Sequence, residues 1–178
     1  MVPDLSGLVL RPWRVEEAEL LFDLHHDPLM RTQAQFDDLD GARAWIAWVD
    51  GLDNGHAFAI ADAADRPWGS IGVTNIDRNA NGWTWYATHA EVRGMGVATD
   101  ALCGIAAWAH AQGLHRLELG HRLNNPASCK VATRAGFIAE GVRREKLLQD
   151  GQRHDTEEHA RLATDPLPEP GRPVIVRP

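Results

Sequence analysis

The sequence predicts a single domain of mixed α/β class, in which helices flank one β-sheet. Short segments rich in β-branched and aromatic residues alternate with amphipathic helical segments. A glycine-rich turn joins one predicted strand to the most strongly amphipathic helix, and an Asp-Gly turn joins the last two strands. A chain of 178 residues is long enough to bury one sizeable core and short for two domains.

The pattern in the first half of the chain predicts one strand, then two helices, then three consecutive strands. Residues 8–10 predict a strand that stops at Pro12, and a helix follows from Val15 through Phe22 until Asp27-Pro28 ends it. A second helix is predicted at about residues 41–52. Strands at 57–61, 68–76 and 83–89 are separated by turns at 65–67 and 79–82.

The second half predicts two helices, each followed by a strand, and a final hairpin. Apolar residues recur at helical spacing over 98–109, and Gly113 offers a C-cap before a strand at 115–121. A short helix follows, with Asn125 as its N-cap and Gly136 beyond its end. Strands at 137–148 and 153–162 flank Asp150-Gly151, a strong hairpin signal.

The stretch Arg93-Gly94-Met95-Gly96-Val97-Ala98 predicts an anion site. A glycine-rich turn exposes backbone N–H groups at the positive end of the helix dipole, where a phosphate can bind. Gly94 and Gly96 permit positive φ and lack a Cβ atom that would hold a phosphate away. The stretch matches no P-loop, and Thr99 stands where the third glycine of G-x-G-x-x-G would fall. A plain turn remains the alternative on this segment alone.

Two blocks together resemble the GNAT superfamily of N-acetyltransferases. Arg93-x-x-Gly96-x-Ala98 matches its [RQ]-x-x-G-x-[GA] pyrophosphate loop, and residues 125–137 lie where it places its second cofactor-contacting helix. The RimJ/RimL-like ribosomal-protein N-acetyltransferases are the most similar subgroup. The segments 8–13, 68–72, 125–128 and 150–155 resemble, in that order, the subgroup's first strand, third strand, N-x-x-S motif and terminal hairpin.

The resemblance implies a mostly antiparallel sheet flanked by about four helices, with an acyltransferase domain at residues 1–163 and a proline-rich tail at 164–178. It implies transfer of an acetyl group from acetyl-CoA to a primary amine by direct attack in a ternary complex. The amine is a protein N-terminus or a small molecule. A longer acyl donor such as succinyl-CoA, or a non-catalytic acyl-CoA-binding or regulatory module, remains an alternative.

The resemblance also implies where the cofactor binds. The pantetheine arm would pair with the backbone of Ala87, Thr88 and His89, and the same backbone would polarise the thioester carbonyl. The remaining contacts would come from Arg93, Gly94, Met95, Gly96, Val97, Ala98, Thr99, Asn125 and Ser128.

Ser128 is the candidate general acid for the leaving thiolate. Many superfamily members hold a tyrosine seven residues after the equivalent of Asn125, but this chain has Ala132 there. Its only tyrosine, Tyr86, is expected to lie elsewhere, and Cys129 is expected to pack.

Glu145 is the candidate base, on a strand that the resemblance places near the acceptor. A catalytic glutamate of one family branch aligns instead with Leu147. Deprotonation through water, involving His89 or Asp155, therefore stays open.

The composition of the chain indicates which classes of binding partner and cellular compartment to expect. The formal net charge of −7 predicts no general affinity for nucleic acid or anionic membranes. With neither a signal peptide nor a membrane-spanning run, we expect a cytoplasmic protein whose cysteines, Cys103 and Cys129, are free thiols. None of the nine histidines belongs to a metal-binding motif, so we expect no metal.

Two further expectations concern apolar residues. Trp13, Trp45 and Trp48 are expected either to pack in the core or to line an acceptor pocket. Residues 165–173 cannot form helix or sheet, and the apolar stretch 174–176 is expected to pack across the domain or to support a homodimer.

Overall fold

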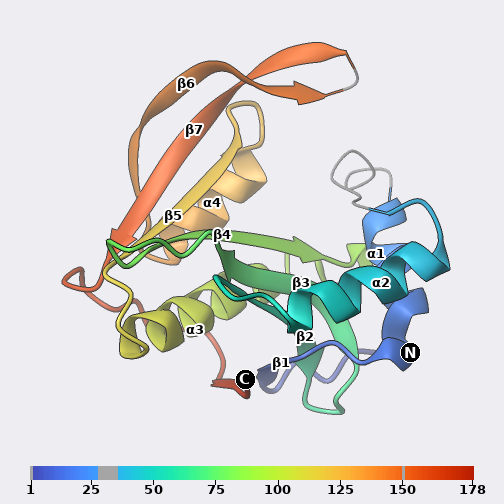
Figure 1. The fold of residues 1–178 in the computed structure, drawn as a ribbon. Helices are drawn as coiled ribbons and strands as arrows, with labels where there is room; N and C mark the ends of the chain where they lie inside the picture. The colour runs from blue at the N-terminus through green and yellow to red at the C-terminus, as the bar shows by residue number, and fades with distance from the viewer. Residues whose placement is uncertain (1, 28–35, 150) are drawn as a thin grey trace.

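One sheet of eight strands and four α-helices make up the part of the chain that the structure describes, residues 2–27, 36–149 and 151–178 of a computed structural model (Figure 1). The strands are β1 (Leu8–Arg11), β2 (His56–Asp62), β3 (Pro67–Thr74), β4 (Asn81–Thr88), β5 (Arg116–Arg122), β6 (Ile138–Gln149), β7 (Gln152–Leu162) and β8 (Val174–Val176). The helices are α1 (Ala18–His26), α2 (Leu39–Asp50), α3 (Val97–Ala111) and α4 (Pro126–Arg134), with short 3-10 turns at η1 (Val15–Glu17) and η3 (Ala90–Val92).

The strand order is β6-β7-β5-β4-β3-β2-β1-β8. Neighbouring strands are antiparallel except for β4 with β5 and β1 with β8, which pair in parallel. The mixed, mostly antiparallel sheet and the four helices confirm the fold class predicted from the sequence.

The helices cover both faces of the sheet and bury two apolar clusters. One cluster packs α3 and α4 against the strands, through residues such as Leu102, Ile105 and Phe137. The other packs α1 and α2 against the opposite face, through residues such as Leu21 and Ile46. The long β6–β7 hairpin extends away from this body (Figure 1).

Most observed boundaries lie within one or two residues of the predicted ones, and two of the differences have a clear physical cause. The first helix begins at Ala18 after the 3-10 turn η1, so Val15 precedes it. β4 begins at Asn81 rather than Trp83, because Asn81–Trp83 pair in parallel with Arg116–Glu118. That pairing joins segments 35 residues apart, which local residue patterns cannot report.

Turn and boundary residues agree with the prediction where they are described. Gln149 pairs with Gln152, and Gly151 has a φ of 73°, as an Asp-Gly hairpin requires. Asp150 of the predicted Asp-Gly turn and Pro28 of the predicted helix end at Asp27-Pro28 lie outside the described residues. No helix in the described part of the chain combines the length and apolar character needed to cross a bilayer.

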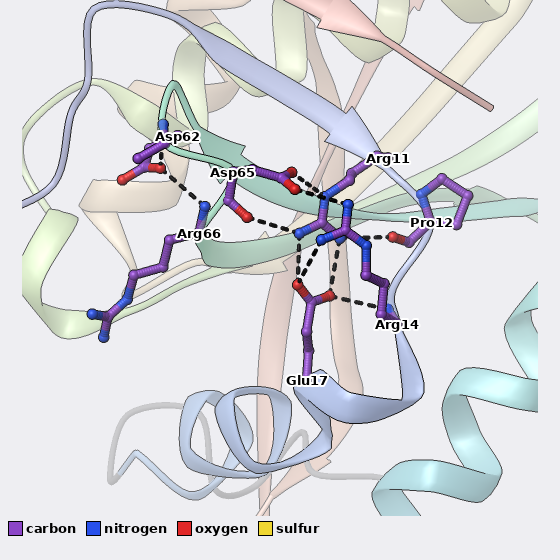
Figure 2. Close-up of polar contacts among 8 residues, drawn as sticks. Arg11, Pro12, Arg14, Glu17, Asp62, Asp65 and Arg66 are labelled. Atoms are coloured by element: carbon purple, nitrogen blue, oxygen red, sulfur yellow. Dashed lines mark hydrogen bonds and ion pairs between the residues drawn. The ribbon is translucent and has the colours of Figure 1, made fainter.

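Arg11 ties three segments together at the end of β1 (Figure 2). Arg11 is buried, with 5% of the residue exposed, and its guanidinium donates to both carboxylate oxygens of Glu17, at 2.9 and 2.6 Å, and to Asp65 Oδ1 at 2.6 Å. Arg14 adds a 2.8 Å contact to the same Asp65. These hydrogen bonds lower the pKa of the Asp65 carboxyl. The arginine of the first-strand motif therefore holds the start of α1 and the β2–β3 turn against the sheet.

The segment after β7 returns to the sheet. Residues 174–176 form β8, which pairs in parallel with Leu8–Leu10 at the sheet edge. Val174 and Val176 pack against the larger apolar cluster, whereas Ile175 is 52% exposed. Of the two expectations for this stretch, packing across the domain is observed.

Candidate functional site

The main cleft arises where two parallel strands separate. β4 and β5 pair only at residues 81–83 and 116–118, and no further pairs between them follow within the described chain. A cavity of about 420 Å³ opens beyond that point. Its walls are the end of β4, the turn and first residues of α3, and α4. We call this cavity the main cleft.

The backbone of β4 faces the cleft with alternate residues. His89 N–H donates to the Trp68 carbonyl on β3 at 2.8 Å, so odd-numbered residues direct their backbone groups to β3. Tyr86 and Thr88 consequently direct theirs toward the gap. An extended ligand can pair with the strand there, as an added strand would.

The turn before α3 presents backbone amides to the cleft. Gly94 and Gly96 have φ of 77° and 82°, and Gly96 is the left-handed N-cap. The first helical hydrogen bond runs from Asp100 N–H to the Gly96 carbonyl, so the amides of residues 97–99 have no acceptor within the helix. This arrangement suits an anion, as the sequence predicts.

Arg93 is a structural link as well as a cleft residue. Its Nε donates to the Thr88 carbonyl at 3.2 Å, and its Nη2 lies 3.0 Å from Asp27 Oδ1. The side chain is 29% exposed. The guanidinium thus joins the end of β4 to the end of α1.

Asn125 and Ser128 form the N-terminus of α4 and line the cleft. Asn125 Oδ1 accepts from the backbone N–H of Ser128, which confirms the predicted N-cap. Pro126 occupies the first turn, where its missing N–H costs nothing. The helix therefore begins at a defined residue, and the Ser128 hydroxyl has a fixed place.

Tyr86 does not lie elsewhere, as the sequence led us to expect; it lines the cleft beside Ser128. Burial raises the pKa of its phenol, and the nearby Ser128 hydroxyl opposes that shift. The geometry is nevertheless too poor for a full hydrogen bond, since the buried Tyr86 hydroxyl has no partner within the described residues. The expectation was wrong because it counted positions along α4, whereas the tyrosine reaches the site from β4.

Four basic residues line the main cleft, and no aspartate or glutamate among the described residues does. They are Arg93 from the turn, Arg122 from the end of β5, and Lys130 and Arg134 from α4. The last three were missed in the sequence. The signal for two of them is the i, i+4 spacing of Lys130 and Arg134 on the predicted helix, which places both on one face.

Most of the predicted cofactor-binding residues line the main cleft: Ala87, Thr88, Arg93, Gly94, Gly96, Val97, Ala98, Thr99, Asn125 and Ser128. His89 and Met95 are absent from the lining. The His89 ring packs edge-on against Trp68, and the Met95 side chain is 50% exposed. The His89 backbone N–H also faces away from the gap, because it is hydrogen-bonded to β3.

A second pocket of about 330 Å³ adjoins the main cleft. Tyr86, Arg122, Asn125 and Ser128 line both cavities, so these residues mark the junction. The second pocket is also lined by Trp83 and Trp85 from β4, and by Lys146 and Glu158 from the β6–β7 hairpin. Glu158 accepts from Thr156 at 2.8 Å and from Lys146 at 3.0 Å.

The structure does not bring Glu145 to either cavity. It is exposed on a bulge of β6, with a φ of 53°. Its backbone N–H donates to Asp155 Oδ1 at 2.8 Å, so Asp155 serves to hold the bulge. Both residues appear in neither lining, because the irregular register between Arg143 and Leu147 turns this part of the strand aside.

The tryptophans divide between packing and lining. Trp13 and Trp45 are 7% exposed within the α1–α2 cluster, whereas Trp48 is 57% exposed. None of these three appears in the lining of the main cleft or of the second pocket. Trp83 and Trp85 line the second pocket instead.

The comparisons with known proteins agree with this geometry. A model of the acetyltransferase (GNAT) domain matches residues 7–138. Probable N-acetyltransferase YjcK of Bacillus subtilis (strain 168) is 31% identical over 117 residues, or 64% of this chain. The match spans 65% of that protein's length.

Solved structures show the same fold. A chimera of Vibrio cholerae spermidine N-acetyltransferase SpeG and hSSAT has a TM-score of 0.81 at 17% identity, covering 88% of this chain and 96% of that one. RimL, a ribosomal L7/L12 α-N-protein acetyltransferase in complex with coenzyme A, has a TM-score of 0.81 at 19% identity, covering 90% and 97%. The microcin C7 self-immunity acetyltransferase MccE, with acetyl-CoA and AMP, has a TM-score of 0.77 at 18% identity, covering 88% and 96%.

Proposed function

Because the chain belongs to the GNAT acetyltransferase family, we propose that it transfers an acetyl group from acetyl-CoA to a primary amine. The observation that carries this proposal is the charge of the main cleft. Four basic residues and no described acidic residue line it, in a chain whose formal net charge is −7. A cleft of that sign in an acidic protein suits a ligand with several phosphate charges, and coenzyme A is such a ligand.

The cofactor would occupy the main cleft along its length. The amides of residues 97–99 would bind the pyrophosphate, and Lys130 and Arg134 would add positive charge beside the phosphates. The pantetheine arm would pair with the backbone of Tyr86 and Thr88, rather than with that of Ala87 and His89 as first expected, because those two direct their backbone groups to β3. This path directs the thioester toward the junction with the second pocket, where Tyr86 and Ser128 lie.

The acceptor amine would enter from the second pocket. Trp83 and Trp85 offer an apolar wall, and Glu158, which pairs with Lys146 at 3.0 Å, is the carboxylate in that lining. The amine loses its proton to water before it attacks. This route replaces Glu145 as base, since that side chain lies outside both described cavities.

The reaction would proceed by direct attack. The neutral amine nitrogen bonds to the thioester carbonyl carbon, and backbone N–H groups of β4 stabilise the tetrahedral oxyanion. The C–S bond then breaks as the Ser128 hydroxyl gives its proton to the departing thiolate, and the serine oxygen regains a proton, through water, from the nitrogen of the new amide. Holding both reactants at the junction supplies the larger share of rate enhancement, since orientation alone can contribute on the order of 7–11 kcal/mol.

The finer assignment follows from the same residues. We propose a RimJ/RimL-like enzyme of the cytoplasm, supported by the Arg11 and Asn125–Ser128 motifs, with a peptide N-terminus or a small amine as acceptor. Both kinds of acceptor occur among proteins of this fold: SpeG is a spermidine N-acetyltransferase, and RimL is a ribosomal-protein α-N-acetyltransferase. A succinyl donor, or a non-catalytic acyl-CoA-binding role, are the alternatives to be tested.

The direct test measures the free thiol released from acetyl-CoA and succinyl-CoA across a panel of peptides, spermidine and small amines. We expect release that depends on both acetyl-CoA and an acceptor. Binding without turnover on any acceptor would support the non-catalytic alternative, and no binding of either donor would refute the proposal.

A matched pair of charge reversals tests the cleft itself. Arg134→Glu should weaken acetyl-CoA binding at least 10-fold, as measured by calorimetry, because it places a carboxylate beside the phosphates. Arg78→Glu makes the same change of net charge on the exposed β3–β4 loop and should leave affinity unchanged. Equal losses in both variants would show that only bulk charge matters.

A further inference from the structure

Four side chains with metal-binding atoms converge beside the junction, from three separate elements. They are His121 on β5, Cys129 on α4, and Glu157 and His159 on β7. One nitrogen, oxygen or sulfur atom from each lies within 4.8 Å of all the others. We propose that these four residues, which we call the His121 cluster, bind a zinc ion.

The sheet register explains why the cluster forms. His121 pairs directly with Glu157 across β5 and β7, and His159 lies two residues further along β7 on the same face. α4 packs over this face and brings Cys129 to the other three. The four positions form no spaced motif in the sequence, which is why the sequence led us to expect no metal.

The distances agree with one face of a coordination tetrahedron. His121 Nε2 and His159 Nε2 are 3.0 Å apart, and Glu157 Oε2 lies 3.3 Å from the first and 3.1 Å from the second. Zinc bonds of about 2.0–2.3 Å place neighbouring ligand atoms about 3.3–3.8 Å apart in a tetrahedron. Shifts of a few tenths of an ångström would therefore admit the ion among these three atoms.

The hydrogen bonding of His121 prepares its ring for a metal. Its Nδ1 lies 2.9 Å from the Arg122 carbonyl oxygen, which can only accept, so the proton resides on Nδ1. The lone pair is then on Nε2, the atom that faces the cluster. A backbone carbonyl on the other ring nitrogen is the usual outer partner of a zinc-binding histidine.

The donor set favours zinc over harder cations. Two imidazoles and a thiolate are borderline or soft ligands, whereas Mg²⁺ and Ca²⁺ prefer oxygen. Four protein ligands leave no open position, which is typical of a structural site. The histidines are 8% and 2% exposed, so the ion would be shielded from bulk solvent.

The consequence for the enzyme would be mechanical. Cys129 follows Ser128 in the first turn of α4, and His121 lines the second pocket. A bound ion would tie that turn to β5 and β7, and would hold the Ser128 hydroxyl in place at the junction. It would take no part in acyl transfer.

The test uses the full chain, freed of any histidine tag and never exposed to chelators. Elemental analysis should find about one zinc per chain. Replacement by Co²⁺ should give the visible bands of a tetrahedral site together with a thiolate-to-cobalt charge-transfer band. Cys129→Ser should abolish the charge-transfer band and weaken zinc binding at least about 100-fold, since even outer-partner changes cost 10–100-fold.

Two further variants keep the result interpretable. Cys103→Ser, at the other cysteine, should retain both the cobalt bands and zinc affinity. Glu157→Gln changes a partly exposed ligand, without disturbing the core, and should also weaken zinc binding. Absence of zinc binding in the folded wild-type protein would refute the proposal and show that His121 and His159 pack together without a metal. Zinc bound with equal affinity by wild type, Cys129→Ser and Glu157→Gln would assign the ion to another site.

Discussion

Asn125 and Ser128 exchange two hydrogen bonds: Oδ1 of Asn125 accepts from the Ser128 backbone N–H at 3.2 Å, and its Nδ2 donates to Ser128 Oγ at 3.0 Å. The Ser128 oxygen therefore accepts from the amide, and its own proton is left to donate elsewhere. An N-cap is ordinarily a matter of helix stability, but here it also orients a hydroxyl at the junction of two cavities.

Ser128→Ala should lower kcat roughly 100-fold, the usual range for loss of a general acid. Acetyl-CoA affinity should stay within about twofold, because the phosphate and pantetheine contacts are untouched. Steady-state kinetics and calorimetry measure the two. Thr133→Ala removes a hydroxyl from the same helix outside both cavities and should leave kcat unchanged. A Ser128→Ala enzyme with wild-type kcat would mean that water protonates the thiolate.

Tyr86→Phe should lower kcat by less than about 100-fold, and by less than Ser128→Ala does, because the phenol lies beside Ser128 at the junction without a hydrogen bond to it. The double variant should resemble Ser128→Ala alone, since both groups serve one proton path. If Tyr86→Phe proves the more damaging of the two, the phenol is the acid and the serine supports it.

Gly96→Asp should weaken acetyl-CoA binding severely, because it adds a negative charge where the pyrophosphate binds. Gly96→Ala separates the causes, since it introduces only a side chain at a φ of 82°, at a cost of about 1–2 kcal/mol in stability. Arg93→Ala should lower the melting temperature, because the Arg93 guanidinium joins Thr88 to Asp27. It should weaken acetyl-CoA binding less than Gly96→Asp does. Unchanged affinity in folded Gly96→Asp would remove the loop from the site.

Stability should fall in mild acid through His25. This ring is 5% exposed, and burial, followed by the neighbouring His26 charge, lowers its pKa to about 4 from 6.5. The unfolded chain binds the proton first, so stability is complete above pH 6.5 and is lost as the pH falls toward 4. The loss at pH 5 is about 2 kcal/mol relative to pH 7.5. Urea unfolding of His25→Phe should show a smaller slope, with the rest coming from His110, whose pKa burial also lowers, whereas the exposed His115→Asn should retain the full slope.

Arg172→Met should destabilise the domain by about 3 kcal/mol. Arg172 Nε lies 2.6 Å from Asp100 Oδ2, and the Asp100 side chain is only 6% exposed, so the substitution strands a buried charge. Urea unfolding measures the loss, with Arg177→Met, at an exposed arginine of the same segment, as control. Equal stability of the two variants would show that solvent already compensates Asp100.

The homodimer, the second expectation for residues 174–176, cannot be tested by deleting the C-terminal tail. Deleting residues 164–178 would remove β8 and the partner of Asp100, so loss of a dimer would reflect loss of the fold. Ile175→Lys changes the exposed side chain of β8 instead. Sedimentation of that variant and of wild type reports the oligomeric state without confounding it.

Local signals predicted most of the fold. Periodicity, the Asn125 cap and the Asp-Gly turn placed the helices and strands, and the glycine turn predicted an anion site, which stays a prediction. The parts that were missed depend on pairing between distant residues. Tyr86 and Ser128 line the same cleft because β4 and β5 separate beyond residues 83 and 118. His121 lies beside Glu157 and His159 because of the β5–β7 register. Neither relation has a local sequence signature.

Gly171 and Arg172 join the C-terminal segment to the turn before α3 and to its first residues. Gly171 N–H and Arg172 reach Asp100 and the Met95 carbonyl across more than 70 residues of chain. The turn at residues 93–99 can form early from neighbouring residues, but it is locked only when the chain through Val176 has emerged and closed onto β1. Contacts of that sequence separation form slowly. Competence to bind acetyl-CoA would therefore be a late event in biosynthesis, and a chain interrupted before residue 171 would carry every cleft residue without a finished cleft.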